Sequence, residues 1–428
     1  MRLTRFGTGA AAADIRALTP PAPGVEDEVR AIIGEVSEGG DRAVARLTER
    51  FDRAEVGPGE LRVPPAEVEA AVGVLEPAVL RALRASIANV RATAAAQVRD
   101  AVTVDLPDGQ SVDIAELPLR RAGAYVPAGR ALYPSTLVMC AATARAAGVD
   151  ETAVCAPPGP RGRAHPVILA ACCLCGVTEV YRMGGAQAIA ALALGTESVP
   201  PVDVIVGPGN AYVQEAKRQL AGRVGIDGFY GPSELVVVAS GGADPGLLAL
   251  DLLAQAEHGA EGLLCAIAPD AGLLGAIGRR VEALAADRPT VSDGRLALVE
   301  AASPRAAVRL ADELAPEHLE LVGAEVEELA GAVRAAGSVF VGRDAATAFG
   351  DYVAGSNHVL PTGGAARFQA GLSVATFTRR MARITLPAGA AARLAPAGAA
   401  LARAEGFPVH AESMERRVAD ATPGDGDV

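Results

Sequence analysis

Histidine is scarce in this chain, so the position of each histidine is informative. Only five of the 428 residues are histidines. Four stand near carboxylate or amide residues in short segments bounded by Gly or Pro: His258, His318, His358 and His410. The fifth, His165, precedes a helix-like segment, where we expect it to cap the helix or lie at the surface. Imidazole, carboxylate and amide groups bind divalent cations and transfer protons, so these segments are candidates for a metal or acid–base site.

Gln255 and His258 stand three positions apart in the segment AQAEHG. On a helix this spacing places both side chains on one face, where an amide oxygen and an imidazole nitrogen can bind one cation. Zinc accepts such ligands, and an Asp and a second His would complete its shell. The same pair is also typical of helix capping, and spacing alone does not show whether Asp351 or His410 belongs to the site.

Glu317 and His318 follow Pro316, which predicts an accessible turn at the boundary of an element. A carboxylate beside an imidazole could divide the proton transfers of a two-step oxidation, one group activating water and the other accepting a hydroxyl proton. The pair could equally begin a solvated helix, so the dipeptide alone leaves both interpretations open.

The usual dinucleotide-binding fingerprint is missing from this sequence. A loose match begins at Gly7, but no strand precedes it. Better candidates are the strand-to-helix turns at residues 183–188 and 206–213, whose glycines allow close backbone approach. The helix that follows each turn can direct its N-terminus at a phosphate. Either turn could also be only a tight chain reversal.

The elements that must position these residues follow an α/β pattern. Residues 25–97 show helical spacing, and 102–106 and 111–117 alternate as strands. Further along, apolar strands are repeatedly followed by a Gly turn and a helix, which predicts parallel sheets wound with helices. Such strands are expected at 152–158, 179–185, 202–210, 234–240, 263–269 and 338–342. The chain after Phe377 is expected to be Ala-rich helix ending in an acidic tail, residues 421–428.

Length and charge limit the classes of protein and partner. A chain of 428 residues favours two large domains. The net charge of -12 disfavours binding to nucleic acid or to an anionic membrane surface. Asp14 and Arg16 interrupt the N-terminal apolar stretch and no long uncharged apolar run follows, so neither a signal peptide nor a spanning helix is expected. The six cysteines lie mostly in apolar runs, which favours buried, reduced thiols in a cytoplasmic enzyme with small-molecule partners.

Eight segments together resemble one family, the histidinol dehydrogenases. They occur in the family's order and approximate spacing between Tyr125 and Arg417, roughly two thirds of the chain. The segments are YVPAGRALYPSTLVM, GGAQAIAALALGT, VDVIVGPGNAYVQEAKR, GPSE, DLLAQAEHG, APEHLEL, GDYVAGSNHVLPTGGAARF and EGFPVHAESMERR.

The resemblance implies a zinc-dependent enzyme that oxidises L-histidinol through L-histidinaldehyde to L-histidine with two NAD, the last step of histidine biosynthesis. It implies one Zn²⁺ per subunit, with Glu317 and His318 as the catalytic base pair. The implied zinc ligands are Gln255, His258, Asp351 and His410, the last from the partner subunit of an intertwined homodimer. The ligands and the base pair would also contact the substrate, together with Ser233, His358 and Glu405. The implied NAD contacts are Tyr125, Gln187 and Asn210.

The fold implied is two Rossmann-like parallel-sheet domains with small helical N- and C-terminal extensions. We expect an N-terminal arm over residues 1–24 and an NAD-binding domain over 124–235. A large domain carrying the metal and catalytic residues would combine 25–123 with 236–373. The C-terminal extension, 374–428, would contribute to the partner's active site.

Several positions depart from the family pattern. Ala128 replaces a usual Gly, Tyr230 with its neighbour Phe229 stands where small residues are common, and Ser356 replaces a frequent Pro. An aromatic-His motif often found near Gln97 is absent. None of these removes a proposed ligand or base, but Tyr230 is close enough to Ser233 to reshape a substrate pocket.

Three alternatives stay open. A paralogous zinc and NAD dehydrogenase, such as the sulfopropanediol type, would keep the machinery and accept another amino alcohol or polyol. A zinc hydrolase would use the same side chains with metal-bound water and no NAD. A structural zinc protein would have a closed site and no turnover.

Overall fold

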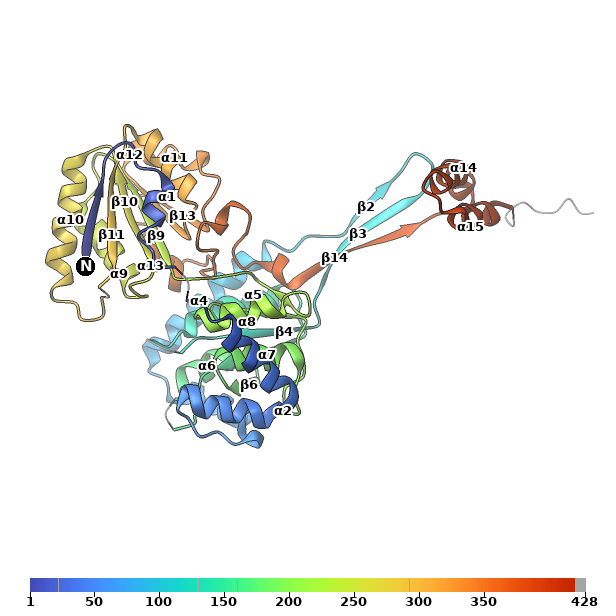
Figure 1. Ribbon diagram of the computed structural model, residues 1–428, viewed down its shortest axis with the longest axis horizontal. Coiled ribbons are helices and arrows are strands. Elements are labelled where there is room, and N and C mark those ends of the chain that lie inside the picture. The colour runs from blue at the N-terminus through green and yellow to red at the C-terminus, as the bar shows by residue number, and fades with distance from the viewer. Residues whose placement is uncertain (22, 129–130, 160, 292, 420–428) are drawn as a thin grey trace, which may run out of the picture. The chain divides into compact units, whose positions relative to one another are not determined.

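The computed structural model describes residues 1–21, 23–128, 131–159, 161–291 and 293–419. The predicted acidic tail, 421–428, lies outside them. The chain divides into two compact units. Unit 1 comprises Met1–Gln97 and Leu119–Phe377, and unit 2 comprises Val98–Pro118 and Thr378–Val428. Unit 1 contains two parallel sheets flanked by helices, which confirms the predicted α/β class (Figure 1).

One parallel sheet of unit 1 has six strands in the order β1-β11-β10-β9-β12-β13. The strands are β1 (Arg2–Phe6), β9 (Glu234–Ala239), β10 (Leu263–Ala268), β11 (Arg295–Glu300), β12 (His318–Val322) and β13 (Ser338–Val341). One face packs against α9 (Pro245–Ala256) and α10 (Ala271–Ala285). The other packs against α1 (Ala12–Arg16), α11 (Pro304–Leu314) and α12 (Ala324–Glu327). Because both faces are covered, the strands are largely apolar: residues 235–239 in β9 and 263–268 in β10 are continuous apolar runs, whereas β12 also contains His318 and Glu320.

The second parallel sheet has five strands in the order β6-β5-β4-β7-β8. They are β4 (Arg121–Tyr125), β5 (Glu151–Ala156), β6 (Glu179–Arg182), β7 (Val204–Val206) and β8 (Gly225–Ile226). One face packs against α3 (Pro65–Ala70), α4 (Pro77–Ala95), α5 (Pro134–Ala146) and α6 (Pro166–Cys175). The other packs against α2 (Glu26–Asp52), α7 (Gly185–Leu194) and α8 (Ala211–Leu220). His165 caps α6 by accepting a hydrogen bond from the Val167 amide, as predicted.

Unit 2 is a three-stranded antiparallel sheet followed by two helices. Its strands, in the order β14-β3-β2, are β2 (Val102–Asp105), β3 (Ser111–Pro118) and β14 (Thr378–Thr385). The helices are α14 (Ala388–Ala404) and α15 (Pro408–Ala419). The prediction of helix directly after Phe377 was wrong for β14. β14 pairs with β3 along its whole length, and Arg380 forms an ion pair with Glu116 on that strand. These cross-strand contacts outweigh the helix propensity of the Ala, Met and Arg residues in β14.

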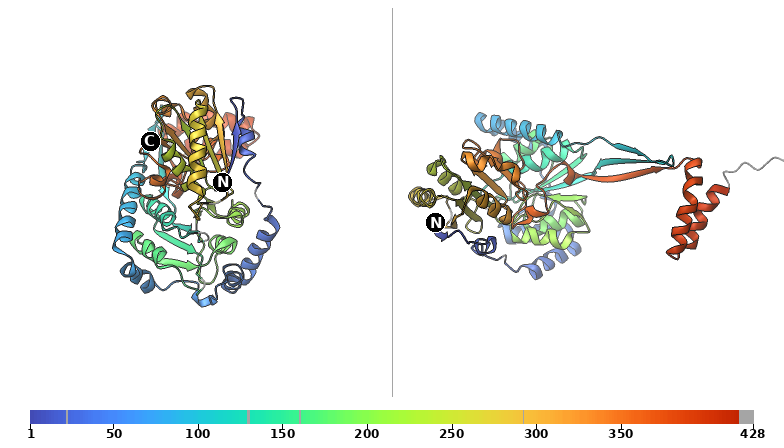
Figure 2. Two further views of the ribbon diagram at one scale, coloured as in Figure 1. Left: turned by 90° about the vertical axis from the view of Figure 1, so that its left-hand side faces the viewer. Right: turned by 90° about the horizontal axis from the view of Figure 1, so that it is seen from above.

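The structure assigns the N-terminal quarter differently from the predicted domains. Within the predicted N-terminal arm, Arg2–Phe6 form β1, which pairs in parallel with β11 at the edge of the six-stranded sheet (Figure 2). Residues 26–95 cover the five-stranded sheet rather than the sheet that carries Glu317. Helical periodicity shows that a helix has an apolar face, but not which sheet that face covers.

The cysteines carry free thiols, five buried and Cys173 partly buried, as the sequence predicted. In the described part of the chain, no helix has the length and apolar character needed to cross a membrane.

Candidate active site

A cavity of about 340 Å³ in unit 1 gathers most of the predicted site residues. Its volume suits a small molecule. The five-stranded sheet contributes the carboxyl ends of its strands, the usual ligand-binding edge of an open α/β sheet. The six-stranded sheet instead contributes residues at the amino ends of β9 and β12. The lining includes Tyr125, Asn210, Tyr230, Ser233, His258, Glu317, His318, Asp351 and His358.

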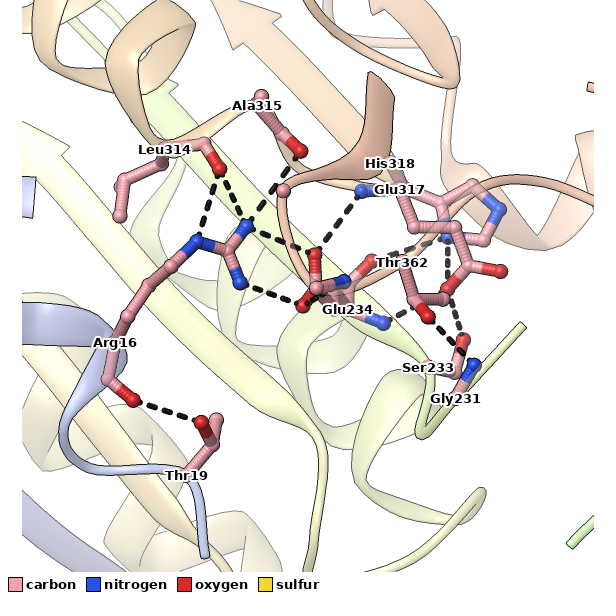
Figure 3. Close-up of polar contacts among 12 residues, drawn as sticks. Arg16, Thr19, Gly231, Ser233, Glu234, Leu314, Ala315, Glu317, His318 and Thr362 are labelled. Carbon is pink, nitrogen blue, oxygen red and sulfur yellow. Dashed lines mark hydrogen bonds and ion pairs between the residues drawn. The ribbon is translucent and has the colours of Figure 1, made fainter. Parts of the chain in front are cut away.

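Glu317 and His318 line this cavity and are buried, with 6% and 3% of their surfaces exposed. The expected accessible turn was wrong, because β12 begins at His318 between two neighbouring strands. The Glu317 carboxylate accepts hydrogen bonds from the Ser233 hydroxyl, 2.5 Å, and the Glu234 amide, 2.8 Å (Figure 3). Burial raises the pKa of Glu317 well above its ordinary value.

The hydrogen bonding of His318 fixes its tautomer. Nδ1 lies 3.1 Å from the Glu234 carbonyl oxygen, which can only accept, so Nδ1 carries the proton. Burial lowers the pKa of His318 to about 3, so the ring is neutral. Its Nε2 then presents a lone pair and lies 3.7 Å from an Asp351 carboxylate oxygen. A neutral imidazole with Nε2 unprotonated can act as a general base.

The candidate metal ligands of unit 1 come from three places in the chain. Gln255 is buried in the last turn of α9, where its Nε2 donates to the Ser233 hydroxyl at 2.6 Å. His258 lies two residues beyond the helix. The prediction that Gln255 and His258 share one helix face was therefore wrong. Asp351 comes from α13 (Thr347–Tyr352).

Their chemistry suits a divalent cation. Burial raises the pKa of Asp351 to about 7 and lowers that of His258. A cation bound beside them would itself favour the ionised carboxylate and the neutral imidazole, because a nearby positive charge lowers the pKa of both groups. Within the described residues, no three His, Cys, Asp or Glu side chains form a ready metal-binding group. The amide, imidazole and carboxylate of Gln255, His258 and Asp351 are donor types that a divalent cation accepts, so the residue types fit the ion.

Glu405 and His410, also predicted to reach the active site, belong to unit 2. Glu405 follows the last turn of α14 and His410 lies in α15, and both are exposed. The His410 ring packs against Phe407, with centroids 5.4 Å apart. Neither residue lines the cavity of unit 1.

His358 lines the cavity, but protein groups occupy both of its ring nitrogens. Nδ1 donates to the Asp351 carbonyl at 2.8 Å, and Nε2 accepts from the Thr136 hydroxyl at 3.0 Å. The ring therefore fastens the α13 segment to α5, a role that the sequence did not suggest.

The three predicted NAD contacts cluster at the carboxyl edge of the five-stranded sheet. The Tyr125 hydroxyl accepts from the Gly185 amide at 3.1 Å, which ties the end of β4 to the start of α7. Gln187 is 1% exposed, and among the described residues its Oε1 has no hydrogen-bond partner. Asn210 caps α8 and lines the cavity.

A buried ion pair that the sequence analysis missed holds the turn before Asn210. Lys217 and Asp227 are fully buried and 2.6 Å apart. Lys217 Nζ also donates to the Gly207 carbonyl at 2.5 Å, and the Asp227 carboxylate accepts from the Gly207 amide at 2.6 Å. Gly207 has φ of 112°, and a Cβ there would clash with the Tyr125 carbonyl, so only glycine fits.

We expect Lys217→Met to lower the free energy of unfolding by about 3–5 kcal/mol, because Asp227 would stay buried without its cation. Urea unfolding followed by circular dichroism measures the change. As a control, Arg46→Met breaks an exposed ion pair with Glu35 and should cost less than about 1 kcal/mol. A double variant with Asp227→Leu should recover much of the loss; if it is as unstable as Lys217→Met, the unpaired carboxylate is not the cause.

Comparison with known proteins identifies the family. The family model described as histidinol dehydrogenase matches residues 20–418. The chain belongs to the histidinol dehydrogenase family. It is 42% identical over 403 residues to a histidinol dehydrogenase from Gluconobacter oxydans, covering 92% of this chain and 93% of the relative. It is 43% identical over 405 residues to one from Rhodospirillum rubrum, covering 92% of each.

A solved histidinol dehydrogenase has the same fold. The crystal structure from Elizabethkingia anophelis aligns with a TM-score of 0.90 at 28% identity, covering 98% of both chains. The match therefore includes both parallel sheets and the elements of unit 2. As a member of the histidinol dehydrogenase family, the protein is an oxidoreductase.

Proposed function

We propose that this protein oxidises L-histidinol through L-histidinaldehyde to L-histidine with two NAD and one Zn²⁺ per subunit, as the last step of histidine biosynthesis. The observation that carries the proposal is the shared cavity, which brings Glu317 and His318 together with Tyr125 and Asn210. The names of the relatives supply the substrate, and the positions of these side chains are compatible with it.

His318 is the base in the first oxidation. The Glu234 carbonyl holds its Nδ1 proton, so Nε2 is oriented to accept the hydroxyl proton of the alcohol. Bound NAD would accept the hydride that leaves the same carbon. Glu317 then takes a proton from water as the water adds to the aldehyde carbon, and the hydrate that forms can lose a hydroxyl proton and pass its hydride to the second NAD. Formation of a carboxylate makes the overall reaction effectively irreversible.

Gln255, His258 and Asp351 would hold the metal with the partner subunit's His410, in a homodimer with shared active sites. When bound, the metal would orient the substrate through its imidazole and amino nitrogens, which is catalysis by positioning. Ser233 and Glu405 are proposed to help hold the substrate. His358 is proposed to contact it as well, but without a ring-nitrogen hydrogen bond, because protein groups occupy both nitrogens. Ser233 also bridges Gln255 to Glu317 by two hydrogen bonds, so it links the metal ligands to the base pair.

A second candidate is a paralogous dehydrogenase of another amino alcohol or polyol, such as sulfopropanediol. Tyr230 supports this alternative, because it lines the cavity near Ser233, where the family usually has a small residue, and a larger side chain there would change which substrates fit. Its hydroxyl donates to the Asp227 carbonyl at 2.9 Å, so the ring is fixed in place. A cytoplasmic location stays a prediction.

The deciding experiment follows NADH formation by the zinc-loaded protein with L-histidinol and a panel of amino alcohols and polyols. We expect the highest kcat/KM for L-histidinol and two NADH for each molecule consumed. Preference for another compound would support the paralog. Product formation without NADH would support a hydrolase, and no turnover a structural zinc protein.

A further inference from the structure

The side chain of Glu234 is a buried charge at the start of an otherwise apolar strand, and its surface is 4% exposed. Oε1 accepts from Arg16 Nη1 at 2.8 Å and from the Gly363 amide at 2.9 Å. Oε2 accepts from Arg16 Nη2 and from the Glu317 amide, both at 3.3 Å (Figure 3). One carboxylate therefore joins the N-terminal segment, the start of β12 and the segment that follows His358.

The main chain of Glu234 contacts both members of the base pair. Its amide donates to the Glu317 carboxylate at 2.8 Å, and its carbonyl accepts from His318 Nδ1 at 3.1 Å. A displacement of Glu234 would therefore move the Glu317 carboxylate. It would also remove the hydrogen bond that keeps the proton on His318 Nδ1.

Arg16 holds this arrangement from the end of α1. Besides its two bonds to Glu234, its Nε donates to the Leu314 carbonyl at 3.1 Å. Leu314 ends α11, and the next residue, Ala315, has φ of 47°, in the left-handed region that non-glycine residues rarely adopt. Arg16 thus fastens a strained turn directly before Glu317.

We propose that Arg16 and Glu234 are positioning residues that hold Glu317 and His318 in catalytic geometry. The inference rests on the proposed function, which gives Glu317 and His318 their roles. Without Arg16 the Glu234 carboxylate would be buried without its cation, which is unfavourable. The carboxylate would then move towards water and lose its hydrogen bonds to the Glu317 and Gly363 amides. Misplacement of about 1 Å at an active site can cost about 100-fold in rate.

We expect Arg16→Met and Glu234→Gln each to lower kcat for L-histidinol oxidation by about 10- to 100-fold. The KM for NAD should stay unchanged, because the proposed NAD contacts belong to the other sheet. Arg16→Lys keeps a cation but cannot form the paired bonds, so its kcat should fall between those of the wild type and Arg16→Met. It also serves as the test if Arg16→Met does not fold.

Arg121→Met is the matched control. Arg121 is 4% exposed and pairs with Glu151 and Glu179 at the amino ends of the five-stranded sheet, outside the cavity lining. Losing this ion pair should lower the melting temperature without changing kcat per folded enzyme. If Arg16→Met and Glu234→Gln behave in the same way, with lower stability and normal kcat, the positioning role is wrong.

A spectroscopic signature tests the geometry independently of turnover. The five histidines allow selective ¹⁵N labelling of the zinc-loaded protein, with the His318 signals assigned from His318→Gln. In the wild type, His318 should show a neutral ring protonated at Nδ1. In Arg16→Met and Glu234→Gln this signal should shift or split between tautomers, whereas in Arg121→Met it should not. An unchanged His318 signal in both site variants would overturn the inference, whereas a wild type without histidinol oxidation would overturn the proposed function.

Discussion

Replacement of Glu317 by Gln is expected to leave the first oxidation largely intact and to slow the second by about 10²–10⁴-fold, the usual contribution of a general base. The amide keeps the shape of the side chain and can accept from the Glu234 amide, but it cannot take a proton from water. Single-turnover measurements with L-histidinol and with supplied L-histidinaldehyde separate the two steps. The aldehyde should accumulate from L-histidinol.

His318→Gln should instead slow the first oxidation, because the base that accepts the hydroxyl proton is lost. The matched control is His165→Gln, which replaces an exposed helix cap outside the cavity and should leave both steps unchanged. If Glu317→Gln oxidises the supplied aldehyde at the wild-type rate, the carboxylate does not activate water. The division of labour between the two side chains would then have to be abandoned.

The sheets could be predicted because their strands carry a local signal. A strand buried on both faces is typically a continuous apolar run, and residues 235–239 and 263–268 show this clearly. β1 and β14 lack it. β1 contains Arg2 and Arg5, and β14 contains three arginines, so neither is an apolar run; both depend on pairing with a strand far away in the sequence, and no local pattern reveals them.

The site could be predicted only in part, for a related reason. His318 could be predicted as a site residue because histidine is rare in this chain, and Glu317 because it is adjacent to His318. Their burial did not follow from the dipeptide. Glu234 and Arg16 were missed although they touch the same site, because 218 positions separate them and neither residue type signals such a contact. Lys217 and Asp227 are closer in sequence, but a lysine on an amphipathic helix ordinarily predicts a solvated face.

The origin of the last metal ligand can be tested by mixing two inactive variants. His258→Ala removes a donor of unit 1 and His410→Ala the donor proposed to come from the partner subunit, so each homodimer should lose at least about 100-fold in activity and bind little zinc. In a heterodimer of the two, one site combines an intact His258 with an intact His410. Co-expression with two affinity tags, followed by assay of activity and bound zinc, measures the outcome.

Random pairing of equal amounts gives half heterodimers with one intact site of two, so the mixture should recover about a quarter of wild-type activity. If His410 instead served its own chain, every site of the heterodimer would contain one altered ligand, and the mixture would stay inactive. Wild-type activity of His410→Ala alone would remove this residue from the ligand set. Recovered activity and recovered zinc must rise together, because Gln255, His258 and Asp351 contribute one donor too few for a tetrahedral protein shell within a single subunit.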